Sequence, residues 1–127
     1  MDEWQNVTKN LSTKLPVKWL SLEALIDQVF SEKSDVWAFG VLMFEAFSCG
    51  QFPYPDVNTF EELIEYLKTD RRMVCPQTAT NEAYEIMLRC WQANPDSRPS
   101  FEELAQQLHM ILSGITVSYG YIESKAE

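Results

Sequence analysis

The hydrophobic pattern predicts one central helix, from Glu32 to Phe47, that is apolar on every side. A helix at a protein surface would keep a polar stripe, so we expect other segments to wrap this one completely. Gly50 and the nearby prolines Pro53 and Pro55 should stop it. The apolar positions that support this prediction are Val36, Trp37, Phe39, Val41, Leu42, Met43, Phe44, Ala46 and Phe47.

Four further helices are predicted around this central one. Ser21 is placed to cap a short helix over residues 22–27. Asn58 with Glu61, and Ser100 with Glu103, form capping-box patterns ahead of two amphipathic helices. The first continues through Ile64 and Leu67, the second through Leu108, Ile111 and Leu112, and residues 82–91 form an amphipathic helix between them.

The remaining segments read as loops and tails. Residues 1–15 are polar and lack a period, residues 16–19 are expected to be extended, and the tail after Gly114 is expected to be extended or mobile. No stretch predicts a convincing run of strands. The sequence therefore predicts a mainly α fold, with a domain over residues 1–112 and a C-terminal tail over residues 113–127.

Composition narrows the class of protein. The 127 residues, 46% of them hydrophobic, fit one domain or part of one, and the net charge of -9 argues against a nucleic-acid groove or a polybasic membrane patch. Cys49, Cys75 and Cys90 are odd in number and show no C-x-x-C spacing, so reduced thiols in a cytosolic setting fit best. The longest apolar run, residues 36–44, is too short to span a membrane.

Several chemistries are excluded by the residues present. The four glycines form neither a G-x-G cradle within the body nor a G-K-S/T motif, so no phosphate cradle is predicted. His109 is the single histidine and is followed by Met110, so an H-R-D catalytic loop cannot be assembled. Metal binding through nitrogen and sulfur ligands would need more than one histidine and three scattered cysteines. We predict no catalytic, cofactor-binding or metal-binding residue in this chain.

Five motifs stand in a family-specific order: LPVKW, SLEAL, SDVWAFGVLMFE, GQFPYPD and RCWQANPDSRPSF. Together, over about residues 5–112, they closely resemble the C-terminal lobe of tyrosine protein kinases. The Pro-Val-Lys-Trp form and the Cys90-Trp91 pair resemble tyrosine kinases rather than serine/threonine kinases. The resemblance implies a partial protein-kinase C-lobe, a helical base without the N-lobe β-sheet.

The same resemblance assigns roles to particular residues. It implies that the loop supporting a substrate tyrosine and the residue after it consists of Leu15, Pro16, Val17, Lys18 and Trp19. For Trp19, packing in the core is about equally good as an explanation. Ser21-Leu22-Glu23 takes the place of Ala-Pro-Glu, and Glu23 is expected to pair with Arg98 as a structural ion pair. Trp37 and Trp91 are expected to be structural.

Asp35 has a special place because it lies in the all-round apolar helix, where an unpaired buried carboxylate would be very unfavourable. In kinases this aspartate accepts backbone N–H groups of the catalytic loop. That loop is missing from this sequence, so Asp35 suggests a truncated domain. The family's activation-loop tyrosines are also missing, because no tyrosine precedes Tyr54.

The sequence thus leaves two hypotheses of function. In the first, the chain is a fragment of a cytoplasmic tyrosine kinase, or of the cytoplasmic part of a membrane receptor. The complete domain would then use ATP and magnesium on a protein substrate with tyrosine, while this piece holds no cofactor and is inactive alone. The alternative is a pseudokinase-like, non-catalytic module that binds peptides or another kinase. No nucleic acid or membrane contact is expected.

Overall fold

The computed structural model describes the backbone of residues 17–118 and the side chains up to residue 114. Within that range the chain is helical and contains no strand, which confirms the mainly α fold class. The elements are η1 (Val17–Trp19), α2 (Leu22–Asp27), α3 (Glu32–Phe47), α4 (Phe60–Lys68), α5 (Asn81–Cys90), η2 (Pro95–Ser97) and α6 (Phe101–Ser118).

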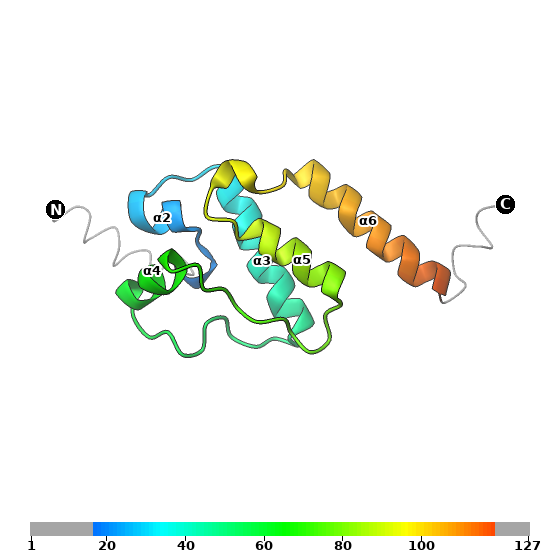
Figure 1. Ribbon diagram of the computed structural model, residues 1–127, viewed down its shortest axis with the longest axis horizontal. Helices are drawn as coiled ribbons and strands as arrows, with labels where there is room; N and C mark the ends of the chain where they lie inside the picture. The colour runs from blue at the N-terminus through cyan, green and yellow to red at the C-terminus, as the bar shows by residue number, and fades with distance from the viewer. Residues whose placement is uncertain (1–16, 119–127) are drawn as a thin grey trace.

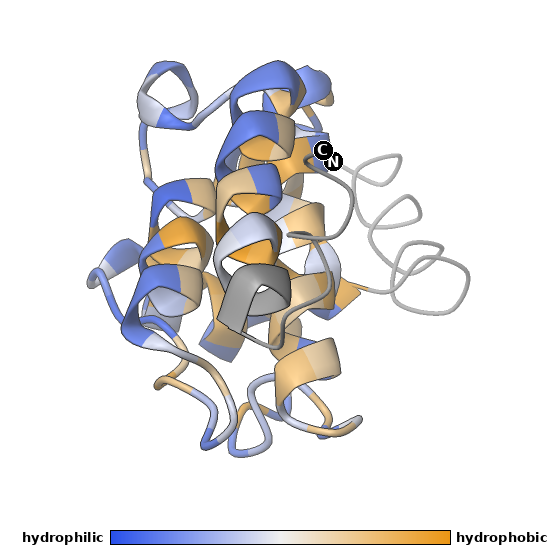
Figure 2. Ribbon diagram, turned by 90° about the vertical axis from the view of Figure 1, so that its right-hand side faces the viewer, coloured by the Kyte–Doolittle hydropathy of each residue, from blue (hydrophilic) through white to orange (hydrophobic). Residues whose placement is uncertain are grey.

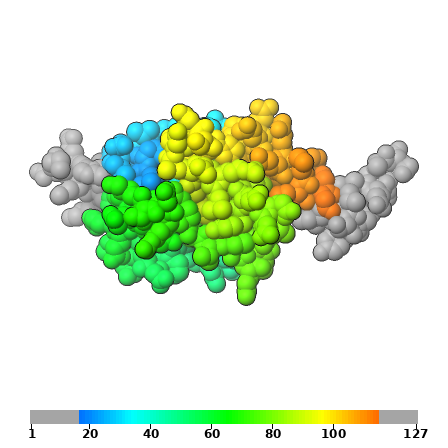
Figure 3. All heavy atoms as spheres, in the orientation of Figure 1, coloured from blue at the N-terminus to red at the C-terminus, as the bar shows by residue number. Residues whose placement is uncertain are grey.

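Helix α3 lies at the centre of the body, with α5 running beside it (Figure 1). Helices α2 and α4 pack against each other on one side of this pair. Helix α6 begins near the first turn of α3, where the N–H of Phe101 donates to Glu32 Oε2, and leads away on the other side. In Figure 2 the packed helices show hydrophobic colours where they face one another. Figure 3 shows the segments around α2, α4 and η2 packed against each other on one face of the molecule. The helices therefore share one core centred on α3.

The close approach of α3 to α5 depends on Gly40. A Cβ atom at this position would lie 2.7 Å from Nε1 of Trp91 and 2.8 Å from Cβ of Cys90. Real Cβ atoms do not approach other heavy atoms so closely, so a larger residue would push the helices apart. Trp91 and Cys90 are themselves buried, so this close crossing lies within the core.

The helix starts agree with the predicted caps at two positions and differ at one. The N–H of Ala24 donates to Oγ of Ser21 over 3.3 Å, and Ser100 and Glu103 form a reciprocal capping box. The predicted box of Asn58 and Glu61 is wrong by one residue. The N-cap is Thr59, one position later: the N–H of Glu62 donates to Thr59 Oγ1, and Glu62 Oε1 accepts from the N–H of the preceding residue, Asn58.

The expected extended conformation before α2 is wrong. Residues Val17–Trp19 form a turn of 3-10 helix, closed by the N–H of Leu20 donating to the carbonyl of Val17 over 3.1 Å. This short local hydrogen bond satisfies the backbone without a neighbouring strand. Leu15 and Pro16 lie outside the described residues.

The expected end of the last helix is also wrong, because α6 continues through Gly114 to Ser118. The predicted extended tail therefore does not begin at residue 113, and residues 119–127 lie outside the described part. One glycine and a few β-branched residues lower helix propensity by only about 1 kcal/mol each or less, whereas each added residue gains one hydrogen bond. Between residues 17 and 118 no helix combines the length and hydropathy of a membrane span.

Helix α3 is not wrapped on all sides, contrary to the prediction. Its inner side, including Trp37, Val41 and Phe44, is buried, but Leu42 is 55% exposed and Ala46 is also exposed. Asp35 precedes Leu42 by two helical turns and lies on the same open side. The periodicity could not show this, because an apolar helix gives the same pattern whether or not every side has a neighbour.

Candidate substrate-binding surface and its support

Lys18 and Trp19 are held in place by the central helix and the loop that follows it. The indole Nε1 of Trp19 donates a 2.8 Å hydrogen bond to Oε1 of Glu45 in α3. The ammonium group of Lys18 donates to the backbone carbonyl of Tyr54 over 2.7 Å. Partial burial lowers the pKa of Lys18 below its usual value. The η1 turn therefore has fixed side chains although it is only three residues long.

Phe52 is a member of this surface that sequence reasoning missed. Its ring meets Trp19 edge to face, with 5.9 Å between ring centroids, and Lys18 Nζ lies 4.8 Å from the centroid of Phe52. The side chain is still 61% exposed. The sequence places Phe52 only between the stop signals Gly50 and Pro53, so its contact with Trp19 was not visible without the fold.

Of the predicted substrate residues, the structure describes three, Val17, Lys18 and Trp19, all half-buried on η1. Trp19 packs partly against the core and partly faces outward beside Phe52. Both explanations offered for Trp19, core anchor and platform, are therefore compatible with its position. Its contact with a substrate stays a prediction.

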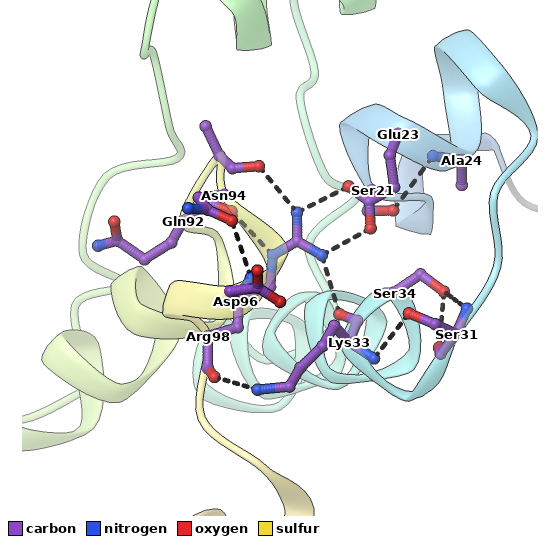
Figure 4. A network of polar contacts seen from close by, with 11 residues as sticks. Ser21, Glu23, Ala24, Ser31, Lys33, Ser34, Gln92, Asn94, Asp96 and Arg98 are labelled. Atoms are coloured by element: carbon purple, nitrogen blue, oxygen red, sulfur yellow. Dashed lines mark hydrogen bonds and ion pairs between the residues drawn. The ribbon is translucent and has the colours of Figure 1, made fainter.

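Glu23 of α2 and Arg98, the residue after η2, form a bidentate ion pair (Figure 4). Arg98 Nη1 donates to Glu23 Oε2, and Arg98 Nη2 donates to Oε1, each over 2.8 Å. The other donors of the guanidinium meet backbone carbonyls of Gln92, Lys33 and Ala93. Arg98 is 2% exposed. The pair therefore ties α2 to η2 and to the start of α3.

Two opposing effects act on the pKa of the Glu23 carboxyl group. Burial by itself would raise the pKa of Glu23, but the hydrogen bonds and positive charge of Arg98, aided by Ser21 and the backbone, hold it below its usual value. Glu23 is therefore ionised at neutral pH, as a paired carboxylate should be. Lys33 adds to the same cluster by donating from Nζ to the carbonyl of Arg98 over 2.6 Å.

Trp37 and Trp91 both lie in the core. The side chain of Trp37 is completely buried. The guanidinium carbons of Arg72 and Arg98 lie 5.1 Å and 4.9 Å from the centroid of its ring. Such cation–π contacts are favourable for desolvated arginines. Arg72 also donates from Nε to the carbonyl of Trp91 over 2.8 Å. Two arginines thus join both tryptophans to the loops on either side of α5.

Asp35 corrects the sequence prediction most clearly. Its side chain is exposed rather than embedded among apolar groups, because it stands in the first turn of α3 on the open side of that helix. A carboxylate there is solvated and complements the helix dipole. Because Asp35 is exposed, it gives no evidence of a missing neighbour, contrary to what the sequence suggested.

The thiol, phenol and imidazole groups outside this surface show no sign of an active site in the described residues. Burial raises the pKa of the Cys90 thiol to about 12, so it is not a nucleophile at neutral pH. Burial also raises the pKa of Tyr54. His109 is exposed on α6. Within residues 17–118 no group of three or more His, Cys, Asp or Glu side chains is arranged to hold a metal ion.

A comparison of the sequence with known protein families shows the class of protein. The profile of the protein tyrosine and serine/threonine kinase family matches residues 1–108. The chain therefore belongs to this family of protein kinases, and its helical structure corresponds to a partial kinase domain without a β-sheet lobe in the described residues.

The glycines within residues 17–114 do not form the kind of cradle that holds the phosphates of ATP in kinases. Gly40 is buried against Trp91, Gly50 stands alone in a turn with φ of +90°, and Gly114 is within α6. None of these builds the run of backbone N–H groups that cradles phosphates. No chemical step is therefore assigned to a nucleotide on the described residues.

Proposed function

We propose that this chain is the substrate-positioning and supporting part of a protein tyrosine kinase and is inactive by itself. The observation that carries the proposal is the η1 turn. Lys18 and Trp19 present a fixed, half-buried surface that is anchored to α3 and to the loop after it. Holding a peptide in a defined place is a large part of catalysis in phosphoryl transfer, because the reaction needs alignment more than covalent help from the protein.

The proposal of tyrosine as the acceptor is supported by the Val17-Lys18-Trp19 segment and by the Cys90-Trp91 pair, which resemble tyrosine kinases. Trp91 and Cys90 are buried where α5 meets α3. They support the fold, whereas the segment ending at Trp19 lies at the surface where a peptide would bind. The substrate is a protein that presents a tyrosine in an accessible segment.

The open side of α3 supports a further part of this proposal, that more of a kinase domain packs on the chain. A helix with so many apolar residues normally buries every side, yet Leu42 and Ala46 are exposed. The complete domain would supply the groups that bind Mg-ATP. The three free cysteines and the acidic composition support a place in the cytoplasm or on the cytoplasmic side of a receptor.

Phosphoamino-acid analysis tests the proposal. A polypeptide from the same gene that includes an ATP-binding segment should transfer the γ-phosphoryl group of Mg-ATP to tyrosine in peptides, while the 127-residue chain alone should show no transfer. Label found on serine or threonine instead of tyrosine would contradict the proposed specificity. Transfer by the isolated chain would contradict the proposed division of labour.

A further inference from the structure

Two of the three free cysteines line one cavity, between the end of α3 and the loop that leads to α5. Cys49 is exposed and directly follows the last turn of α3, and Cys75 is half-buried on the loop between α4 and α5. The cavity has a volume of about 430 Å³. A free cysteine usually serves as a buried packing group, which describes Cys90 in the core but neither of these two thiols.

A hydrogen bond holds the two segments that carry these cysteines against each other. The hydroxyl of Thr78, three residues after Cys75, donates to the carbonyl of Phe47. Phe47 in turn stands two residues before Cys49. The thiol of Cys75 folds back on its own loop, with Sγ 3.4 Å from the carbonyl oxygen of Pro76. Both cysteines therefore stand within a few residues of one fixed point of contact.

The lining of the cavity offers the two sulfur atoms as its reactive groups. None of the lining residues is charged, and the apolar ones include Phe44, Phe47 and Val74. A charged ligand would lose its hydration there without gaining a counter-charge. Because both thiol-bearing side chains border the same space, each can turn into it without displacing a residue of the core.

We propose that Cys49 and Cys75 form a thiol pair that a hydroperoxide, such as hydrogen peroxide, converts into an intramolecular disulfide. The sulfur of Cys49, the more exposed thiol, attacks one peroxide oxygen, the O–O bond breaks, and water leaves as Cys49 becomes a sulfenic acid. The sulfur of Cys75 then attacks the sulfur of Cys49, the S–O bond breaks, and the thiol proton leaves with the hydroxyl group as a second water. Both cysteines are thereby oxidised, and one peroxide is reduced.

The disulfide joins the end of α3 to the loop after α4 and closes a covalent ring that contains α4. Such a ring stabilises a fold mainly by restricting the unfolded chain. In a reducing compartment, disulfides of this kind are transient and act as redox sensors. The inference goes beyond the proposed function and does not depend on it, because it rests on two thiols and their cavity rather than on the η1 surface.

Peptide mapping of the 127-residue chain tests the pair directly. The chain is treated with a small excess of hydrogen peroxide at low protein concentration, its remaining thiols are alkylated in denaturant, and it is digested with trypsin. Cleavage after Arg72 separates Cys49 from Cys75. Cleavage after Arg89 separates Cys75 from Cys90. Mass spectrometry should find the first two peptides joined by a bond that dithiothreitol breaks, with Cys90 alkylated.

Serine variants show which thiol reacts first. In Cys75→Ser the sulfenic acid of Cys49 has no partner thiol, so it should persist long enough to be trapped by dimedone. Cys49→Ser should leave Cys75 reduced at the same dose of peroxide. Circular dichroism checks that both variants keep the helical fold. Cys90 is the internal control in every sample, because its thiol is buried and should stay reduced.

Urea unfolding gives an independent measurement of the ring. The unfolding midpoint of the oxidised chain should be higher than that of the reduced chain and should return to it after dithiothreitol. Peroxide should not raise the midpoint of Cys75→Ser. A midpoint of the wild-type chain that does not rise would contradict the closure of a ring on the native fold.

The peptide map also names the results that would overturn the proposal. These are three alkylated cysteines after peroxide treatment, sulfinic acid at Cys49 with Cys75 still free, and a disulfide that joins two chains instead of closing within one.

Discussion

At the scale of the residue, the Glu23–Arg98 pair shows how one ion pair can organise several segments. Arg98 is almost completely buried, and its guanidinium reaches Glu23 of α2, the carbonyl of Lys33 in α3 and two carbonyls before η2. A buried charge is tolerable only when its donors are satisfied in this way. The pair therefore fixes the position of the segment that follows the η1 surface.

Replacing Glu23 by alanine should lower the free energy of unfolding by about 3 to 5 kcal/mol, because the guanidinium of Arg98 would stay buried without its counter-charge. Urea unfolding followed by tryptophan fluorescence measures the change. The matched control is Glu85→Ala, which breaks the exposed 3.8 Å pair of Glu85 with Arg89 within α5. Its cost should stay below about 1 kcal/mol. A similar loss of unfolding free energy in both variants would contradict this prediction, because the buried Glu23–Arg98 pair would then contribute no more than the exposed Glu85–Arg89 pair.

The residues also show where sequence reasoning reached its limit. The pairing of Glu23 with Arg98 was predictable, because a family resemblance supplies long-range partners that local patterns cannot. The exposure of Asp35 and the contact of Phe52 with Trp19 were not. Both depend on which side of α3 has a neighbour and on how a loop folds back, and neither leaves a periodic signal in the chain.

At the scale of the element, helices were predictable where a cap and a hydrophobic stripe agreed. Ser21 and Ser100 mark the starts of α2 and α6 as predicted. The start of α4 moved by one residue because two capping patterns overlap there, and local chemistry alone does not choose between them. The end of α6 was placed too early because Gly114 read as a stop, although the helix passes through it.

The contact between α3 and α5 gives an element-scale prediction at Gly40. Gly40→Ala should lower the free energy of unfolding by about 1 to 3 kcal/mol, because the added methyl group collides with Trp91 and Cys90. Gly114→Ala is the matched control, since nothing lies within 4 Å of a Cβ at that position. That variant should stabilise the helix by up to about 1 kcal/mol. Thermal melts of the two variants should shift in opposite directions, and a shared direction would refute the tight crossing.

At the scale of the whole molecule, the chain combines a well-made core with one helix that keeps an open side. The core joins α2 to α6 through α3 and the two arginines that stack on Trp37. In the described residues the glycines form no phosphate cradle, and no three His, Cys, Asp or Glu side chains are grouped to hold a metal ion. The proposed function accordingly assigns peptide positioning to η1 and nucleotide chemistry to other parts of a kinase domain.

Isothermal titration calorimetry of Mg-ATP into the 127-residue chain tests this division of labour most directly. The account predicts no saturable heat, because the chain has no glycine-rich loop and no H-R-D or D-F-G segment to hold nucleotide and metal. A saturable isotherm with a defined stoichiometry would contradict it, because the chain would then contain a nucleotide site of its own.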